Sequence, residues 1–178
     1  LLINMNYKKN ILRKLITEHL DFPKKGIIYR DVLPLLQYPE IFSTVIKEMS
    51  SSEIFKNADA ILSIDARGFI FGSAISLTLS KPMVVARKPG KLPGEVIEKS
   101  YDLEYGNNSL AIQKKSIEKF NSFAIVDDLL ATGGTVKCVS EMLKDFNKEV
   151  IGLSVVIELE ELKGRDKFNF PVESTILL

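Results

Sequence analysis

The chain has 178 residues, which corresponds to about one domain at roughly 150 residues per domain. Hydrophobic residues make up 46% of it and charged residues 26%, so a disordered chain, a collagen-like repeat and a disulfide scaffold are all disfavoured. The 24 lysines and arginines nearly balance the 23 aspartates and glutamates, and the net charge of +1 argues against a general nucleic-acid binder. We therefore expect any anion-binding site to be local.

Cysteine content and hydropathy bear on the compartment. Cys138 is the single cysteine, which excludes an internal disulfide and a cysteine-based zinc site and fits a reducing compartment. The most apolar long stretch, residues 69–79, is too short for the ~20 residues of a membrane helix. The first residues lack the pattern of a secretory signal, and Met5 is the expected natural start. We expect a cytoplasmic protein with no membrane partner.

The first part of the chain predicts two amphipathic helices. Residues 5–20 place apolar side chains on one helical face, ending before Asp21-Phe22-Pro23, and His19 is expected at the surface near the end of this helix. A second helix is predicted after Pro39, where apolar residues again recur at helical spacing.

Four short apolar runs then predict strands that are buried on both faces: residues 60–64, 83–86, 123–126 and 150–157. Helical patterns lie between some of them, at residues 69–79 and 136–146. This alternation predicts an α/β fold with a central, mostly parallel sheet flanked by helices. Ligands of such sheets bind beyond the carboxyl ends of the strands.

Residues 87–105 interrupt this rhythm. They contain Pro89-Gly90 and Pro93-Gly94, several lysines and glutamates, and little helical periodicity. We expect a long loop here, and loops of that length are usually functional or disordered.

The most informative motif runs from Phe123 to Thr135. An apolar strand leads into Asp127 and Asp128, and Ala131-Thr132-Gly133-Gly134-Thr135 follows at a predicted helix start. Two glycines allow close backbone approach, and a helix N-terminus offers unpaired amides to a phosphate. A carboxylate pair beside such a cradle suits the hydroxyls of a sugar, so the motif indicates a sugar phosphate. The alternatives are a metal-dependent phosphotransfer fold and a simple Gly-Gly turn; a Walker loop is absent from the sequence.

Basic residues follow two other predicted strands. Arg67 precedes Gly68 at a strand-to-helix turn, where its planar fork suits phosphate oxygens. Arg87, Lys88 and Lys91 follow the next strand beside the Pro-Gly pairs. Both sets could be ordinary solvated surface residues, but their place at strand ends favours an anion site.

The motif at 123–135 resembles the phosphoribosyl-pyrophosphate (PRPP) signature of the type I phosphoribosyltransferase family. Further stretches resemble the adenine-specific members of that family, in the expected order: Phe22-Pro23 with residues 26–31, and residues 65–69, 87–94 and 100–106. The resemblance implies a single domain over residues 1–178, with an N-terminal hood at about 1–35 and a flexible catalytic loop at about 88–106. It also implies a glycosyltransferase of purine salvage, which transfers the 5-phosphoribosyl group of PRPP to N9 of adenine and yields AMP and pyrophosphate.

The resemblance further implies roles for individual residues. Glu104, with Tyr105, would be catalytic, Glu104 handling the proton at purine N7. PRPP would be bound by Asp127, Asp128, Ala131, Thr132, Gly133, Gly134 and Thr135. Pyrophosphate would be bound by Asp65, Ala66, Arg67, Arg87, Lys88 and Lys91, and adenine by Ile28, Tyr29, Arg30 and Leu129.

Other implications concern geometry, metal and assembly. The Asp65–Ala66 peptide bond is expected to be cis. Mg²⁺ is expected to be held mainly through PRPP rather than directly by protein side chains. A homodimer is expected, with Arg87 completing the site of the other subunit.

Two alternatives remain at this point. A purine phosphoribosyltransferase for hypoxanthine or xanthine would share most of these motifs. A PRPP-sensing regulator that binds nucleic acid would share the fold, although the net charge of +1 argues against it.

Overall fold

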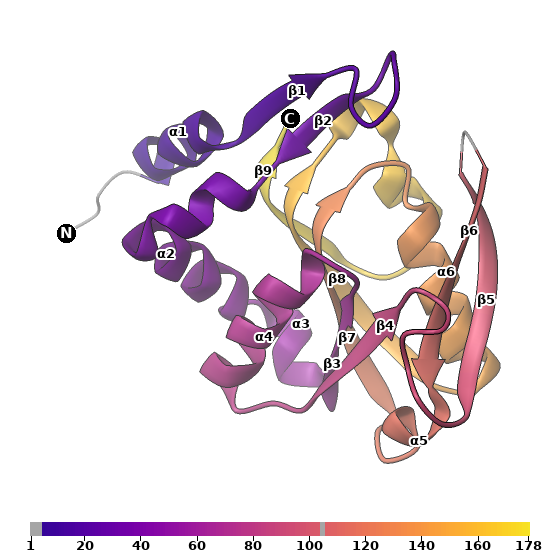
Figure 1. Ribbon diagram of the computed structural model, residues 1–178. Helices are drawn as coiled ribbons and strands as arrows, with labels where there is room; N and C mark the ends of the chain where they lie inside the picture. Colours follow the sequence, from indigo (N-terminus) through magenta and orange to yellow (C-terminus); the bar gives the residue numbers. More distant parts are fainter. Residues whose placement is uncertain (1–4, 104–105) are drawn as a thin grey trace. The chain divides into compact units, whose positions relative to one another are not determined.

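The computed structural model describes residues 5–103 and 106–178, and the side chains of all of these except 5–9, 102, 103, 106 and 107. The chain divides into two compact units, Leu1–Ile46 and Lys47–Leu178 (Figure 1). The predicted α/β sheet belongs entirely to the second unit.

The first unit combines short helices with a two-stranded hairpin. Its elements are α1 (Met5–Leu15), β1 (Thr17–Leu20), β2 (Ile28–Asp31), η1 (Leu33–Gln37) and the start of α2 (Pro39–Ser50), which crosses the boundary between the units. The predicted helix after Pro39 is confirmed by α2.

The prediction of one helix over residues 5–20 is wrong at its end. Thr17–Leu20 forms an antiparallel pair with Ile28–Asp31, so the chain leaves the helix after Leu15. Leu20, which shares the helical spacing of the apolar face, is 72% exposed and contributes nothing to a buried stripe. His19 lies in β1 rather than in a helix and is exposed, as expected.

The second unit contains a seven-stranded sheet in the order β5-β6-β4-β3-β7-β8-β9. Neighbouring strands are parallel from β4 through β3, β7 and β8 to β9, whereas β6 pairs antiparallel with both β4 and β5. The strands are β3 (Ala60–Ile64), β4 (Met83–Arg87), β5 (Val96–Leu103), β6 (Gly106–Gln113), β7 (Ser122–Leu130), β8 (Glu149–Glu158) and β9 (Val172–Leu177). The mostly parallel sheet and its four predicted strands are confirmed.

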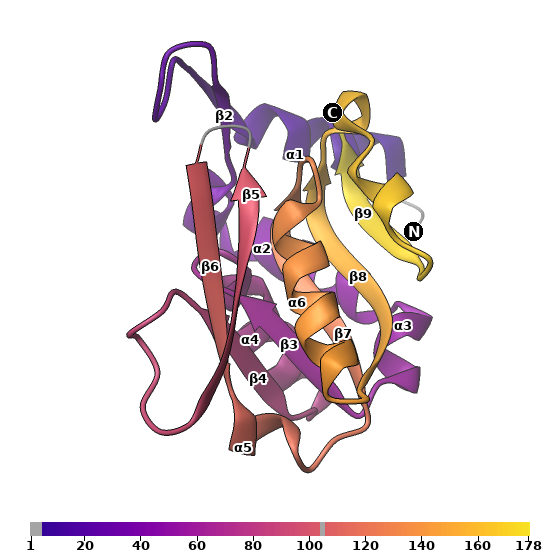
Figure 2. The same ribbon diagram turned by 90° about the vertical axis from the view of Figure 1, so that its right-hand side faces the viewer.

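Helices cover both faces of this sheet. The unit contains α3 (Glu53–Asn57), α4 (Gly68–Leu79), α5 (Lys114–Ile117), α6 (Gly134–Asp145), η2 (Glu160–Leu162) and η3 (Gly164–Lys167). The β3–α4–β4 and β7–α6–β8 connections step in opposite directions along the sheet, so right-handed crossovers place α4 and α6 on opposite faces. Figure 2 shows α6 in front of β7 and β8, with α3 and α4 behind. The strand order therefore reverses between β3 and β7, which is where open α/β sheets bind ligands.

The core explains why the strand predictions succeeded. All five residues of β3 are buried, and every residue of β7 except Leu129 is buried as well. Helix α4 approaches β3 closely, because a Cβ at Gly72 would lie 2.0 Å from the Oγ of Ser63. These strands consist of apolar runs because helices cover them on both sides.

The expectation of a loop over residues 87–105 is wrong for its second half. Residues 96–103 form β5, which pairs with β6 from Val96 opposite Gln113 to Leu103 opposite Gly106. Ile97, Lys99 and Tyr101 are partly buried, whereas Glu98 and Ser100 are exposed. Because Lys99 lies on the same face as Ile97 and Tyr101, the sequence of β5 does not show the regular alternation of apolar and polar residues that predicts a strand.

Across the described part of the chain, none of the helices is both long and apolar enough to cross a membrane.

Candidate active site

Three strand ends supply the predicted site residues of the second unit. Asp65, Ala66 and Arg67 follow β3, Arg87 ends β4, and the 131–135 loop follows β7. Strands β3 and β7 are adjacent and parallel, with Ser63 opposite Val126, so the segments that follow them emerge side by side. This edge is the point of reversed strand order at which ligands are expected.

Asp127 and Asp128, here called the acid pair, lie near the end of β7, which continues past the predicted end at residue 126 to Leu130. They are 9% and 5% exposed, and the backbone N–H of Asp128 donates to Oδ1 of Asp127 over 2.8 Å. Gly68 makes room for the pair, because a Cβ there would lie 2.9 Å from the same Oδ1. Burial, together with the charge of Asp128, raises the pKa of Asp127 well above its ordinary value. Burial also raises the pKa of Asp128.

Arg67 connects the β3 end to the acid pair. Its Nε lies 2.7 Å from Oδ2 of Asp128, and its side chain is 24% exposed. The positive charge of Arg67 partly offsets the effect of burial on the pKa of Asp128. The sequence predicts that Arg67 binds a phosphate anion. In this structure Arg67 contacts the carboxylate of Asp128, near the end of β7.

Asp65 gathers the basic residues that follow β4. The Asp65–Ala66 peptide bond is cis, as predicted. Oδ2 of Asp65 accepts hydrogen bonds from Nε of Arg87 over 3.2 Å and from the backbone N–H of Lys88 over 3.5 Å. Arg87 also donates to the carbonyl of Lys91 over 3.3 Å. The structure thus brings Asp65, Arg87, Lys88 and Lys91 together at one edge of the sheet.

Position 133 of the 131–135 loop requires glycine for two separate reasons. Gly133 has φ of +81°, a left-handed conformation that favours glycine, and it directly precedes α6. A Cβ at Gly133 would also lie 2.9 Å from the carbonyl oxygen of Gly164 and 3.0 Å from Cζ of Phe168. The loop therefore delivers the N-terminus of α6, with its unpaired amides, to the same edge as the acid pair.

The sequence predicts no role for the half-buried ion pair of Glu158 and Arg165, which lies next to this loop. Glu158, at the end of β8, is 2% exposed and accepts hydrogen bonds from Nε and Nη2 of Arg165 and from Oγ of Ser174. The hydrogen bond from Arg165 lowers the pKa of Glu158. Gly164, next to Arg165, is packed so closely that its Cβ would lie 2.2 Å from the carbonyl oxygen of Ala131. One feature of the sequence could indicate this ion pair: Glu158 ends an apolar run, and Arg165 follows seven residues later.

The predicted adenine-binding residues divide between the two units. Ile28, Tyr29 and Arg30 form most of β2 in the first unit, and Leu129 belongs to β7 in the second. Within the first unit, Nε of Arg30 lies 3.3 Å from Oε1 of Glu18 on the paired strand. Tyr29 packs edge-on against Phe22, with ring centroids 5.1 Å apart. The predicted catalytic residues Glu104 and Tyr105 lie outside the described residues.

The carboxylates of Asp65 and Asp128 form ion pairs with arginines rather than a cluster. Among residues 5–103 and 106–178 no group of three or more histidine, cysteine, aspartate or glutamate side chains is arranged to hold a metal ion. Asp128 faces Arg67, and Asp65 faces Arg87.

Comparisons of the sequence and of the structure with known proteins all find phosphoribosyltransferases. Residues 36–174 match the model of the phosphoribosyl transferase domain. An adenine phosphoribosyltransferase of Prochlorococcus marinus is 65% identical over 168 residues, which cover 94% of this chain and 98% of that protein. Among solved structures, the adenine phosphoribosyltransferase of Rhodothermus marinus superposes with a TM-score of 0.90 at 31% identity, covering 97% of this chain and 99% of that one. The Saccharomyces cerevisiae enzyme, solved with adenine and an imino-altritol bisphosphate, gives a TM-score of 0.87 at 34% identity, covering 96% and 99%.

Proposed function

Because the chain belongs to the phosphoribosyl transferase domain family, we propose that it transfers the 5-phosphoribosyl group of PRPP to N9 of adenine. The bond between C1 of the ribose and the pyrophosphate oxygen breaks, and its electron pair leaves with pyrophosphate. A bond forms between C1 and N9, adenine loses a proton, and AMP results. The observation that carries the proposal is the meeting of Arg67, the acid pair and the 131–135 loop at the reversal of strand order.

The 131–135 loop and the acid pair form the proposed ribose-phosphate site. The amides at the start of α6 and the hydroxyls of Thr132 and Thr135 bind the 5′-phosphate, assisted by Ala131, Gly133 and Gly134. Asp127 and Asp128 accept hydrogen bonds from the ribose hydroxyls. A bound sugar replaces water with fixed hydrogen-bond donors, which favours the charged form of both buried carboxylates.

The β3 and β4 ends form the proposed pyrophosphate site. Arg67, Arg87, Lys88 and Lys91 supply positive charge for the leaving group, together with the backbone at Ala66. Asp65 acts on this site through one cation and one backbone group, because its carboxylate accepts from the Arg87 guanidinium and from the backbone N–H of Lys88. Binding of pyrophosphate in the site of the other subunit would draw Arg87 from Asp65 to the more highly charged anion.

Adenine and its proton are assigned to residues in other parts of the chain. The residues proposed to bind adenine are Ile28, Tyr29 and Arg30 in the first unit and Leu129 in the second. Glu104 accepts the N7 proton as N9 attacks C1, and Tyr105 is assigned to the same catalytic segment.

Mg²⁺ is proposed to enter with PRPP. The ion keeps several waters and is bound largely by substrate phosphates, so it needs no cage of protein ligands. When bound, Mg²⁺ would neutralise negative charge on the pyrophosphate.

The proposed assembly is a homodimer, and the proposed compartment is the cytosol. Leu77 on α4 is 83% exposed, and a second copy would cover this apolar side chain. Arg87 at the end of β4 is the residue proposed to serve the partner's site. Cys138 is a buried free thiol, which suits a reducing compartment.

The activity is tested by measuring AMP formation from PRPP with adenine, hypoxanthine or guanine as the acceptor. We expect adenine to be used far better, because a site built for the 6-amino edge leaves polar groups unpaired against a 6-oxo group. Equal turnover of hypoxanthine would favour the 6-oxopurine alternative, and absence of any nucleotide product would refute the proposed reaction.

A further inference from the structure

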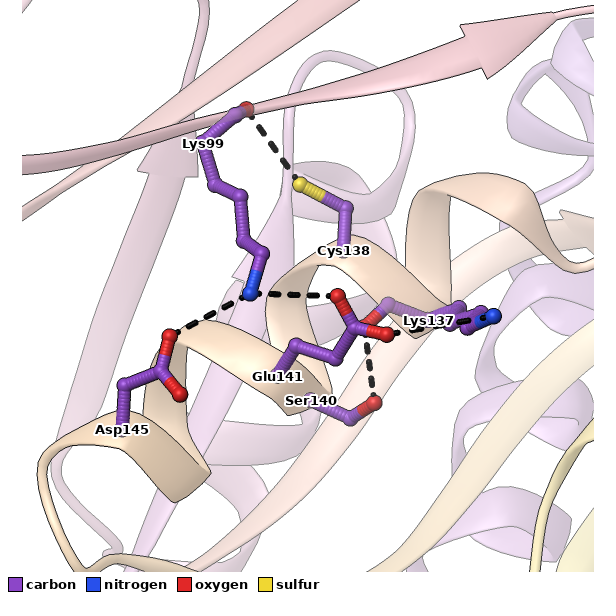
Figure 3. Close-up of polar contacts among 6 residues, drawn as sticks. All are labelled: Lys99, Lys137, Cys138, Ser140, Glu141 and Asp145. Atoms are coloured by element: carbon purple, nitrogen blue, oxygen red, sulfur yellow. Dashed lines mark hydrogen bonds and ion pairs between the residues drawn. The ribbon is translucent and has the colours of Figure 1, made fainter.

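Strand β5 lies along helix α6 and is attached to it by polar contacts (Figure 3). Nζ of Lys99 lies 3.1 Å from Oε2 of Glu141 and 3.2 Å from Oδ2 of Asp145. The thiol of Cys138 donates to the backbone carbonyl of Lys99 over 3.4 Å. The strand is therefore fixed to three points spread over two turns of the helix.

The fourth contact joins β5 to the first turn of α6. Oγ1 of Thr135 lies 3.2 Å from the hydroxyl oxygen of Tyr101, and the ring of Tyr101 packs against the hydrophobic core. Because Lys99 is bonded to residues 138, 141 and 145 whereas Tyr101 is bonded to residue 135, β5 runs toward the N-terminus of α6. This is the end of the helix at which the 5′-phosphate is proposed to bind.

The two hydroxyls can reverse their roles when phosphate binds. In the present arrangement Thr135 donates to Tyr101. Each hydroxyl is both a donor and an acceptor. Tyr101 can therefore donate a hydrogen bond to Thr135 while Thr135 donates one to a phosphate oxygen. A chain of hydrogen bonds of this kind strengthens each member in a site of low dielectric constant.

We propose that Lys99 and Tyr101 are positioning residues of the transfer reaction, which dock β5 on α6 and thereby orient the Thr135 hydroxyl toward the bound 5′-phosphate. This inference rests on the proposed function. Lys99 acts through Glu141 and Asp145 on the position of β5, and so on Tyr101, two residues later in the strand. Tyr101 acts through Thr135 on the phosphate.

The other polar groups around Lys99 have structural rather than chemical roles. Burial raises the pKa of the Cys138 thiol to about 11, so it serves as a hydrogen-bond donor and not as a nucleophile. Lys137 lies 3.9 Å from Oε1 of Glu141 and competes only weakly with Lys99 for this carboxylate. The hydroxyl of Ser140 donates to the carbonyl of Lys137 within the helix.

The Lys99 contacts are tested by Lys99→Met, with Lys99→Arg as the conservative variant. We expect Lys99→Met to raise KM for PRPP about threefold with a smaller change in kcat, and Lys99→Arg to restore most of the lost affinity. Lys56→Met is the matched control, because it breaks an ion pair with Glu53 on α3, far along the chain from β5. Hydrogen exchange should show faster opening of the β5 amides in Lys99→Met than in the control.

The Tyr101 contact predicts the same kind of kinetic change, with a larger effect. Tyr101→Phe should raise KM for PRPP about fivefold with a smaller change in kcat, because the phosphate site loses an oriented donor. The double variant with Thr135→Val should be less impaired than the sum of the single effects. Tyr38→Phe, at an exposed tyrosine of the first unit, is the control and should change neither constant.

Failure of the inference can be distinguished from failure of the reaction. If the unaltered protein forms AMP but Lys99→Met keeps the unaltered KM for PRPP, or Tyr101→Phe and Thr135→Val act additively, the positioning roles are refuted and the reaction stands. If Lys99→Met does not fold, Glu141→Gln combined with Asp145→Asn removes the same ion pairs from the helix side. An unaltered KM for PRPP in that variant would equally refute the proposal, and a protein that forms no AMP at all would refute both.

Discussion

The acid pair is held in surroundings that oppose its charge. Asp127 and Asp128 are adjacent and buried, and burial raises the pKa of both. An acid whose pKa is raised in the folded state contributes most stability below its ordinary pKa, and this contribution is lost as the pH rises through the folded value. Near neutral pH the ligand-free protein is therefore less stable than it would be with an uncharged pair.

Asp127→Asn should accordingly stabilise the ligand-free protein while weakening PRPP binding. The expected increase in Tm at pH 7 is about 2–4 °C, the shift that 1 kcal/mol produces in a domain of this size. Because the benefit comes from removing a charge, it should shrink as the pH falls toward 3.8, the ordinary pKa of the carboxyl. Thermal melting over this pH range measures it, and a lower Tm for the variant at pH 7 would contradict the assignment.

The proposed proton acceptor is tested at the same scale. Glu104→Gln should lower kcat by ~10²-fold or more, within the range of general acid–base contributions, with little change in the Kd for PRPP. Glu98→Gln is the matched control, because Glu98 is an exposed carboxylate of β5 on the face opposite Lys99. Equal kcat in the two variants would remove Glu104 from the chemistry.

At the scale of elements, the segment after β8 supports the 131–135 loop. The Glu158–Arg165 ion pair holds the two 3₁₀ turns against that loop, and the backbone N–H of Leu159 donates to the carbonyl of Leu130 over 2.9 Å. Gly133 in the loop and Gly164 in the turns allow the two segments to pack in direct contact, so a small shift of one segment would displace the other.

Glu158→Gln should therefore destabilise the protein and raise KM for PRPP. We expect a loss of ~1–2 kcal/mol at pH 7, smaller than for a fully buried pair because the Arg165 side chain is 46% exposed. The hydrogen bond from Arg165 lowers the pKa of Glu158, so its contribution is present above the ordinary value of 4.5 and is lost as the pH falls through the folded value. Denaturant unfolding at pH 7 and pH 3 measures this, and a difference that grows toward pH 3 would contradict it.

The elements also show what the sequence could and could not predict. β3 and β7 were predictable because helices cover both faces, so burial left long apolar runs. β5 was not, because its inward face carries Lys99, whose partners lie on α6 about forty residues later. The 131–135 motif and the cis bond after β3 were predictable from resemblance. The contacts of Arg67 with Asp128, and of Arg87 with Asp65, depend on strand order and could not be derived from spacing.

At the scale of the whole molecule, assembly is tested at the exposed face of α4. Leu77→Asp should convert the proposed homodimer to a monomer, because a buried carboxylate at an apolar interface is costly to desolvate. Sedimentation velocity measures the mass, and Leu20→Asp, at an exposed leucine of the first unit, is the control. A Leu77→Asp protein with unchanged mass would exclude this face, and an unaltered protein that sediments as a monomer would exclude the dimer.

The whole account depends on where the sugar phosphate binds. A crystal structure of the protein with AMP tests this most directly. We predict the 5′-phosphate against the amides of residues 131–135 at the N-terminus of α6, with the ribose hydroxyls on Asp127 and Asp128. Phosphate density at another edge of the sheet, with residues 131–135 and the acid pair free of ligand, would contradict the central claim.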